Sequence, residues 1–472
     1  MFQLIIEQNM PSIIKSQPEK TPVAEVISPC IPTEAFKRLV GNGAFFLDSA
    51  LSMGEDLVRY SFLGCKPLMV LKSKGRNITI KDRNRSVKKT GNPFEELRRI
   101  LKTFRSEDPT ASNIPFTGGA VGYMSYDLCR FIERLPSTTV DDVGFPDMYF
   151  GFYDKVIIYD HYANKCLLAG GNEEDDYLAA AVRNKGAASK TGSCPSKSNN
   201  RPVIKSNFTK DSYLDAIRRA KEYIAQGDIY QVNLSQRFET EIGVPPHELY
   251  MRLRAVNPAP FSAYLQFDNK AVVSSSPERF LRLRQGRVQT RPIKGTRPRG
   301  SDAKSDKNLE AQLIKSPKDN AELTMIVDLE RNDLGRVCNY GSVRVTGNRT
   351  LEAHPTVFHL VATVEGDLHP RYDAVDLIKA TFPGGSITGA PKIRAMEIID
   401  ELEPTSRSLY TGAIGYIGFN GNMDFNIAIR TFLVKDSRAY FQVGGGIVAD
   451  SDPEEEYQET LHKARALMES IV

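Results

Sequence analysis

The chain has 472 residues, of which 41% are hydrophobic and 25% are charged, the proportions of an ordinary soluble globular protein. Its net charge of +4 is too small and too evenly spread to indicate binding to nucleic acid or to a membrane surface. No run of about 18 apolar residues occurs, so no membrane span is expected. The first residues lack the basic segment and long apolar core of a signal peptide, and the six cysteines form no CxxC pair. Both features favour a cytoplasmic protein with reduced thiols.

Alternation of polar and apolar residues predicts short strands in the first part of the chain. They are residues 44–48, 68–71, 78–80 and 155–160. Helical spacing of apolar residues predicts helices at residues 34–40 and 93–103.

Residues 182–206 interrupt these patterns. Within them, residues 185–200 are small and polar, with almost no aliphatic side chains, and cannot bury a face against a core. We therefore interpret residues 182–206 as a flexible linker or surface loop. It divides an N-terminal region, residues 1–181, from a larger region, residues 207–472, which we expect to be catalytic.

The larger region begins with an amphipathic helix predicted at residues 211–226. Strands are predicted at residues 230–238, 261–267, 270–274 and 280–284. Strands dominate and do not alternate strictly with helices, which favours an α+β fold with two large, mostly antiparallel sheets flanked by helices. We expect both halves of the chain to contribute strands to one intertwined unit, with the cleft mainly in residues 207–472.

Lys294 lies in a sharp bend between Pro292 and Gly295. A lysine in such a bend can point into a cleft, where a partly dry environment would lower its pKa and make the amine a nucleophile. The alternative is a solvated lysine in an arginine-rich turn, which is the commoner situation in an arbitrary protein.

Two predicted helices begin with Ser-Pro or Asp-Pro, as an N-cap followed by proline does, and carry acidic pairs. The first holds Asp319 and Glu322, and the second holds Glu456 and Glu459; the members of each pair share a face. These acids could simply complement the helix dipoles. If they converge, their hard oxygen atoms would suit Mg²⁺, and spacing alone does not decide between the two readings.

Three glycines, residues 444–446, precede the second of these helices. They allow backbone N–H groups to approach an anion closely, or they mark a bulge or tight bend in a sheet. The glycine-rich run at residues 384–392 lacks the Gly-Lys-Ser/Thr ending of a phosphate-binding loop, so we reject a nucleoside triphosphatase.

At these motifs the chain resembles the chorismate-utilising enzymes, from about residue 20 to residue 470 with residues 182–206 unmatched. The specific strings are 227–238 (GDIYQVNLSQRF), 275–280 (SSPERF), 290–299 (TRPIKGTRPR), 326–335 (IVDLERNDLG), 354–359, 382–392, 424–431 and 444–460. The N-terminal half matches more loosely, through 59–64 (RYSFLG) and 117–123 (TGGAVGY).

Two positions separate the branches of this family. Isochorismate and salicylate synthases have a water-activating lysine where this chain has Gln231, and anthranilate synthases typically have alanine where it has Lys294. The resemblance at Lys294, with Asn233 in the Gln-Val-Asn-Leu string, therefore implies the aminodeoxychorismate synthase branch, component I. That branch aminates chorismate at C4 for p-aminobenzoate and folate synthesis. The rivals are an anthranilate synthase component I, for tryptophan synthesis, and a non-catalytic, effector-binding regulatory subunit.

The resemblance also implies roles for individual residues. Glu278 would protonate the leaving C4 hydroxyl, Lys294 would attack C2 to form a covalent adduct, and His359 would lie near the ring of chorismate. Taken alone, Glu278 could be an exposed turn acid and His359 a satisfied core residue. The implied substrate-binding residues are Arg430, Tyr410, Thr296, Gly295, Gly445, Gly446 and Gln231. The implied Mg²⁺ ligands are Glu322 and Glu456, with Asp319 and Glu459 bonded directly or through water.

No glutaminase-type segment with a nucleophilic cysteine is recognisable in the sequence. Ammonia from glutamine therefore implies a separate glutamine amidotransferase subunit. The resemblance also implies that the N-terminal half could hold an effector pocket near Leu47, Asp48 and Ser49.

Overall fold

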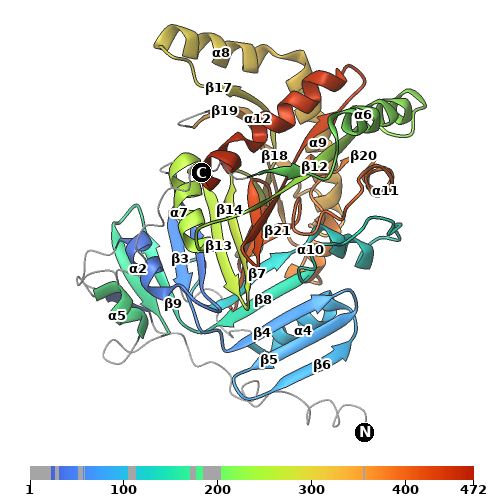
Figure 1. Ribbon diagram of the computed structural model, residues 1–472. Coiled ribbons are helices and arrows are strands. Elements are labelled where there is room, and N and C mark those ends of the chain that lie inside the picture. The colour runs from blue at the N-terminus through green and yellow to red at the C-terminus, as the bar shows by residue number, and fades with distance from the viewer. Residues whose placement is uncertain are drawn as a thin grey trace.

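Two large antiparallel sheets organise the computed structural model (Figure 1), which describes residues 23–26, 31–51, 57, 59–104, 113–170, 177–183, 203–354 and 357–472. Sheet A contains, in spatial order, β1 (Val23–Val26), β10 (Lys165–Ala169), β9 (Val156–Asp160), β3 (Tyr60–Gly64), β2 (Phe45–Asp48), β13 (Phe261–Phe267), β14 (Lys270–Ser276), β23 (Thr431–Lys435), β24 (Arg438–Ile447), β12 (Gln231–Glu241) and β11 (Lys205–Ser206), with β20 (Gly389–Ala390) beside β12.

Sheet B is built in the same way from both halves of the chain. It contains β17 (Ile293–Pro298), β19 (Val357–Asp367), β16 (Arg287–Arg291), β15 (Arg279–Arg284), β22 (Met423–Ile427), β21 (Ala413–Gly418), β7 (Gly119–Met124), β8 (Met148–Tyr153), β4 (Met69–Lys74), β5 (Asn77–Asp82) and β6 (Ser86–Thr90), with β18 (Arg344–Ala353) beside β19.

The two halves of the chain are joined inside each sheet. In sheet A, β2 of the N-terminal half pairs with β13 of the C-terminal half, and in sheet B, β7 pairs with β21. The prediction of an α+β fold with two large antiparallel sheets and intertwined halves is confirmed. Each predicted strand and helix named above corresponds to an observed element, with ends that differ by a few residues.

The segment predicted as a linker is only partly described. Helix α5 (Tyr177–Arg183) includes residues 182 and 183, and β11 lies at residues 205–206. The small, polar run at residues 185–200 lies outside the described residues.

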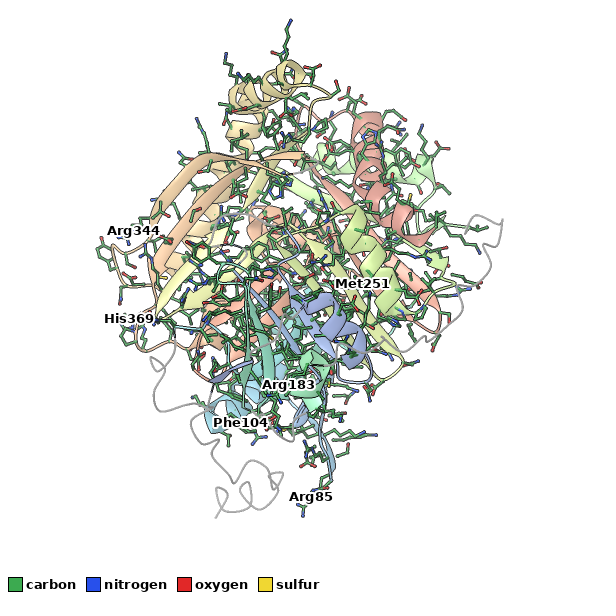
Figure 2. The ribbon with its side chains drawn as sticks, turned by 90° about the vertical axis from the view of Figure 1, so that its left-hand side faces the viewer. Arg85, Phe104, Arg183, Met251, Arg344 and His369 are labelled. Atoms are coloured by element: carbon green, nitrogen blue, oxygen red, sulfur yellow. The ribbon has the colours of Figure 1, made fainter. Side chains whose placement is uncertain are left out.

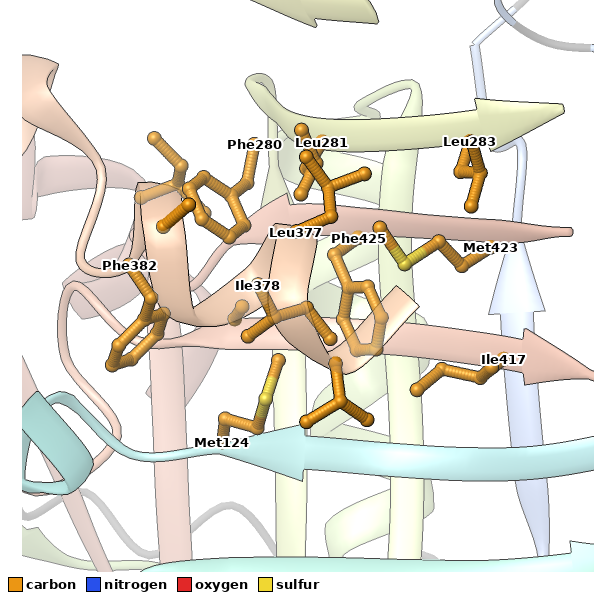
Figure 3. Close-up of a cluster of buried hydrophobic side chains, with 14 of the residues drawn as sticks. Met124, Phe280, Leu281, Leu283, Leu377, Ile378, Phe382, Ile417, Met423 and Phe425 are labelled. Atoms are coloured by element: carbon orange, nitrogen blue, oxygen red, sulfur yellow. The ribbon is translucent and has the colours of Figure 1, made fainter. Parts of the chain in front are cut away.

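The helices cover the outer faces of the two sheets and one end of sheet A. They are α2 (Pro32–Leu39), α5, α7 (Pro246–Val256) and α12 (Pro453–Ile471) on sheet A; α4 (Pro93–Phe104), α8 (Ala303–Lys315), α9 (Pro317–Gly335) and α10 (Ala374–Thr381) on sheet B; and α6 (Lys210–Ala225) and α11 (Lys392–Leu402) beside β12. Figure 3 shows Leu377 and Ile378 of α10 packed against Phe280, Leu281 and Phe425 of sheet B. Figure 2 shows charged side chains such as Arg85 and Arg344 projecting from the rim, where both are exposed.

The predicted starts of the two acidic helices are also confirmed. The Ser316 hydroxyl accepts a hydrogen bond from the Asp319 N–H at 3.2 Å, with Pro317 in the first turn of α9. The Asp452 carboxylate accepts the first N–H groups of α12 in the same way. Within the described residues, no helix is both long and apolar enough to cross a membrane.

The layer between the sheets is aromatic and joins the two halves of the chain. Phe267 at the end of β13 is 1% exposed and stacks on Tyr149 of β8 with ring centroids 4.1 Å apart. Tyr123 and Phe145, also from the N-terminal half, surround the same ring. This packing makes the two halves mutually dependent for stability.

Replacing Phe267 with alanine should therefore destabilise both halves together. We expect the free energy of unfolding to fall by about 3–5 kcal/mol, because the substitution leaves a cavity among fully buried rings. Urea unfolding followed by circular dichroism would measure this. The control Tyr340→Ala, at a fully exposed position, should change stability little. Two separate transitions, one unaffected, would contradict the intertwined core.

Candidate active site

The bend that carries Lys294 is a break in the pairing of β17 with β19. The register shifts between Ile293 and Thr296, and Gly295 between them has φ +81°. A Cβ added at Gly295 would lie 2.8 Å from a Leu313 methyl group and 3.0 Å from the Asp319 side chain. Only glycine suits both the backbone conformation and this close approach. The missing side chain lets the start of α9 pack against the bend.

Lys294 points into the protein rather than into solvent. Its side chain is 12% exposed, and Nζ lies 3.8 Å from Glu322 Oε2 on α9. Burial lowers the pKa of Lys294; the Glu322 carboxylate opposes this and the Lys463 ammonium adds to it. The environment is therefore partly dry, as the nucleophile reading requires, and the alternative of a solvated turn lysine is excluded.

Glu278 is also buried, which excludes the exposed turn acid. It is 4% exposed, and its Oε1 accepts hydrogen bonds from the Ser386 hydroxyl at 2.7 Å and from the Ile293 N–H at 3.3 Å. The second bond places the carboxyl group next to the residue that precedes Lys294. Burial raises the pKa of Glu278 to about 7, against the opposing effect of the Ser386 hydrogen bond. At neutral pH a large fraction of Glu278 therefore keeps its proton.

Ser386 is a site residue that the sequence reasoning missed. It lies in a short 3-10 helix, Gly385–Ile387, within the glycine-rich run that lacks a phosphate-loop ending. The Gly385 N–H donates to Glu330 of α9 at 3.1 Å, so one turn connects two buried carboxyl groups. Burial and the neighbouring Asp333 raise the pKa of Glu330 to about 7. The signals in the sequence were the glycine-rich run and the family string at residues 382–392, and neither indicated these partners.

His359 belongs to a second group of polar residues on β17 and β19. Its Nδ1 is 3.0 Å from the Thr296 hydroxyl, while its buried Nε2 has no hydrogen-bond partner. It is therefore not the satisfied core histidine of the alternative reading. Burial, and then the positive charge of Arg430, hold the pKa of His359 well below its usual range. The imidazole is consequently neutral, with one ring nitrogen free for a ligand.

Arg430 lies close enough to His359 to lower the pKa of that imidazole, and Tyr410 lies beside Gly444. Arg430 has φ +50° and donates to Asn257 at 3.2 Å. Among the described residues Arg430 forms no ion pair with a carboxylate, so its guanidinium group is available to bind an anion. The Tyr410 hydroxyl would lie 2.9 Å from a Cβ added at Gly444, and burial raises the pKa of Tyr410.

The glycines at residues 444–446 lie in β24. Side chains from several other elements lie close to the positions that their Cβ atoms would occupy. A Cβ at Gly445 would lie 3.1 Å from Glu456 Oε2 and 3.7 Å from Glu459 Oε1. A Cβ at Gly446 would lie 2.1 Å from Gln231 Nε2 and 3.4 Å from Lys294 Nζ. These positions lack side chains because the site occupies that space.

Each of the four carboxylates predicted to bind Mg²⁺ lies near a positively charged side chain. Asp319 pairs with Arg297 at 2.9 Å and Glu459 with Lys463 at 2.6 Å. For Glu322 the nearest recorded cation is Lys294, and for Glu456 it is Lys318, each at the longer distance of 3.8 Å. Glu322 and Glu456 thus keep more of their charge uncompensated, which fits hard oxygen ligands of a divalent cation. The described residues nevertheless contain no group of three or more His, Cys, Asp or Glu side chains already placed to hold a metal ion.

A separate cavity lies where the effector pocket was expected. Its volume is about 160 Å³, and its walls include Leu47, Asp48 and Ser49. Arg279 and Asp424, an ion pair at 3.0 Å, also line it. None of the implied catalytic residues lines this cavity, so it is distinct from the Lys294 site.

Comparison with known proteins identifies the family. Residues 60–469 match the family described as chorismate binding enzyme. Anthranilate synthase component 1 of Acetivibrio thermocellus is 41% identical over 458 residues, covering 93% of this chain and 92% of that protein. Aminodeoxychorismate synthase component 1 of Bacillus subtilis is 41% identical over 421 residues, covering 88% and 89%.

Comparison with solved structures supports the same family. Anthranilate synthase component I from Streptococcus pneumoniae superposes with a TM-score of 0.74 at 32% identity, covering 96% of this chain and all of that one. The menaquinone-specific isochorismate synthase of Escherichia coli has a TM-score of 0.71 at 17% identity, covering 100% and 98%, and shares the fold. From the family match and the identity to these relatives, the chain belongs to the chorismate binding enzymes.

Proposed function

We propose that this chain is the chorismate-aminating component of an aminodeoxychorismate synthase, which replaces the C4 hydroxyl of chorismate with an amino group. The observation that carries the proposal is the buried Lys294 amine next to the buried Glu278, whose Oε1 accepts a hydrogen bond from the N–H of Ile293, the residue before Lys294. Burial lowers the pKa of Lys294 and raises that of Glu278. Relatives with either activity are equally similar to this chain, so the site residues must decide. By the family resemblance, an anthranilate synthase would have alanine in place of Lys294.

The chain's own residues support a two-step substitution. Glu278 donates its proton to the C4 hydroxyl, which leaves as water, while the Lys294 lone pair attacks C2 and the ring double bonds shift. The new C–N bond holds the ring on Lys294, and the proton released by the amine returns to Glu278. Ammonia then adds at C4, the double bonds shift back, and the bond between C2 and the Lys294 nitrogen breaks. The new C4 ammonium group loses a proton and the departing Lys294 nitrogen gains one, so Lys294 leaves as the free amine. The net reaction exchanges ammonia for water.

The remaining residues hold and orient chorismate. Arg430 and Tyr410 would bind one carboxylate, and the N–H groups of Gly445 and Gly446 are the additional donors we expect. Thr296 and His359 would face the ring. Mg²⁺, when bound, would neutralise and orient the other carboxylate. Glu322 of α9 and Glu456 of α12 would hold it. Asp319 and Glu459, which pair with Arg297 and Lys463, would be bonded to it directly or through water.

The ammonia would come from a separate glutamine amidotransferase subunit. The relatives are named as component 1, which implies a second component. The four described cysteines, Cys65, Cys129, Cys166 and Cys338, are all buried and unsuited to attack glutamine. We place the reaction in the cytoplasm, on the route to p-aminobenzoate and folate.

Anthranilate synthase remains the second candidate, because relatives of that name match as closely. Mass spectrometry of the product from chorismate, an ammonium salt and Mg²⁺ separates the two. Amino-deoxychorismate supports our proposal, and fluorescent anthranilate with pyruvate refutes it. The same purified chain should make no product from glutamine in place of the ammonium salt.

Substitution of Lys294 by alanine tests the covalent route. Amination should slow by about 10²-fold or more, while chorismate still binds through Arg430 and Tyr410. Wild-type protein given chorismate and Mg²⁺ without ammonia should gain the mass of chorismate minus water on the peptide that contains Lys294. The exposed Lys315→Ala variant is the control and should behave as wild type. Full activity of Lys294→Ala without any adduct would show that Lys294 is not the nucleophile.

The pH dependence of adduct formation should report on Glu278. Because this residue must be protonated to act, the rate should fall as pH rises through about 7, the pKa of Glu278. Deprotonation of Lys294, whose pKa is lowered by burial, should act in the opposite direction and raise the rate with pH. Glu278→Gln should be slow and lack the alkaline decline.

The same residue should leave a signature in stability. Its folded-state pKa is raised, so the stability it contributes is lost progressively as pH rises from about 4.5 to about 7. Glu278→Gln should therefore increase the melting temperature more at pH 8 than at pH 5. Equal effects at both values would contradict a buried, protonated Glu278.

Removal of one acid tests the metal site. Glu322→Ala should abolish Mg²⁺-dependent turnover and weaken Mg²⁺ binding measured by calorimetry in the presence of chorismate, with the fold retained. Asp328→Asn, on an exposed face of the same helix, is the matched control. Unchanged Mg²⁺ affinity in Glu322→Ala would remove this residue from the metal site.

A further inference from the structure

Two buried carboxyl groups, those of Glu278 and Glu330, accept hydrogen bonds from one short turn. The turn is the 3-10 helix Gly385–Ile387. The Gly385 N–H donates to Glu330 Oε1 at 3.1 Å, and the hydroxyl of the next residue, Ser386, donates to Glu278 Oε1 at 2.7 Å. Glu278 and Glu330 are 4% and 3% exposed. The place of the Ser386 hydroxyl against Glu278 therefore depends on what holds Gly385.

The Glu330 carboxyl group has no cation of its own. The neighbouring Lys392 ammonium pairs with Asp333 and donates to two backbone carbonyl groups of the preceding segment. These three bonds use all the donors of a lysine. Within the described part of the chain Glu330 forms no ion pair, and the hydrogen bond recorded for it is the one from Gly385. The contact with the turn is thus the recorded polar function of this buried acid.

The turn lies directly on helix α9, which carries Glu330. A Cβ added at Gly385 would lie 2.5 Å from a Leu329 methyl group and 3.2 Å from Glu330 Oε1, so a side chain there would push the turn away from the helix. The far end of the turn is held separately, because Arg407 donates to the Ile387 carbonyl at 3.1 Å. Glu330 therefore fixes the end of the turn that precedes Ser386.

The two hydrogen bonds recorded for the Glu278 carboxyl group end on the same oxygen atom. Oε1 accepts from the Ser386 hydroxyl and from the Ile293 N–H. Two donors occupy both lone pairs of a carbonyl-type oxygen, so the proton of the neutral acid lies on Oε2. In the proposed reaction the Oε2–H bond breaks, its electrons stay on the carboxylate, and the proton joins the departing C4 hydroxyl. The Ser386 bond thus determines which oxygen donates.

We propose that Glu330 is a positioning residue for the proton donor: it holds the turn at Gly385 so that Ser386 occupies Glu278 Oε1 and the acidic proton lies on Oε2. The inference rests on the proposed amination, in which Glu278 is the acid. Glu330 acts through Ser386 and makes no contact with chorismate.

The charged groups around Glu330 keep a large fraction of it uncharged at neutral pH. Burial and then the Asp333 carboxylate raise the pKa of Glu330 to about 7; the Lys392 ammonium and the Gly385 hydrogen bond oppose them, and Glu278 adds to the rise. Glutamine resembles this protonated side chain in size and offers the same acceptor oxygen. Glu330→Gln should therefore keep the turn in place, whereas Glu330→Leu removes the acceptor.

The Ser386 hydrogen bond gives the proposal a signature in pH. It lowers the pKa of Glu278 against the larger effect of burial, as do the charges of Lys294 and Lys463. Loss of this bond should raise the pKa of Glu278 above about 7. The alkaline decline in the rate of adduct formation should then move to higher pH.

The variant Glu330→Leu tests the proposal by the rate of the Lys294 adduct, measured by mass spectrometry across pH with chorismate and Mg²⁺ but no ammonia. The rate should fall roughly ten-fold, and its alkaline decline should shift upward in pH. KM for chorismate, measured in amination with an ammonium salt, should change less than about two-fold. Glu330→Gln should retain the wild-type rate within about two-fold and keep the decline near pH 7.

A double variant separates this role from a general loss of stability. Ser386→Ala should slow the adduct and shift the decline as Glu330→Leu does, and combining the two should add little, because both remove the same hydrogen bond. A purely structural Glu330 would lower the melting temperature and leave the decline in place. Asp328→Asn, on the exposed face of α9, is the control and should match wild type.

If Glu330→Leu does not fold, Glu330→Asp carries the same expectations, because one methylene group fewer withdraws its carboxyl group from Gly385. Three results would overturn the role of Glu330: an unchanged rate and decline, effects that add to those of Ser386→Ala, and a loss of folding in both variants. Failure of the wild-type chain to form the adduct or to aminate chorismate would refute the proposed function itself. An active wild type with an equally active Glu330→Leu would refute only the positioning role.

Discussion

The missing side chain at Gly295 determines the position of the Lys294 amine. With φ +81° and α9 packed against its Cα, this residue lets β17 bulge away from β19 and turn the lysine inward. A Cβ there would displace the start of α9, and Glu322 with it, from the amine. One close backbone contact thus fixes the lysine, the nearest carboxylate and the helix on which the acid lies.

Burial then shifts the pKa values of Glu278 and Lys294, the acid and the amine of the proposed reaction, in opposite directions. Desolvation disfavours the charged form of each, so Glu278 keeps its proton to higher pH and Lys294 keeps its neutral amine to lower pH. No special partner is required for either change. The hydrogen bonds from Ser386 and Ile293 reduce the effect on Glu278 and hold its carboxyl group in place. A single dry pocket therefore prepares both the acid and the amine.

Much of the fold could be predicted from local sequence, and the features that could not be predicted share a physical cause. Alternation, helical spacing and N-cap residues depend on near neighbours, so the strands, α6 and the starts of α9 and α12 were predicted correctly. Contacts between distant segments leave no such pattern. Ser386 reaches Glu278 across 108 residues, and Glu330 holds the turn of Ser386 from another helix. Residue spacing likewise predicted the two acidic pairs but not the ion pairs that they form. Arg297 pairs with Asp319 and Lys463 with Glu459 only in the folded chain.

The costs in stability are the clearest marker of where this protein acts. Gln231, Asn233 and His359 keep buried polar atoms without partners, and Lys294 and Glu278 are ionisable groups held out of water. Each of these features opposes folding, and a chain selected for stability alone would replace them with apolar or paired residues. They are tolerated because two interleaved sheets and their aromatic interior stabilise the whole unit. Gln231 and Lys294 meet at the vacant Cβ position of Gly446, and this meeting, rather than any one motif, is the strongest structural argument that a ligand completes this site.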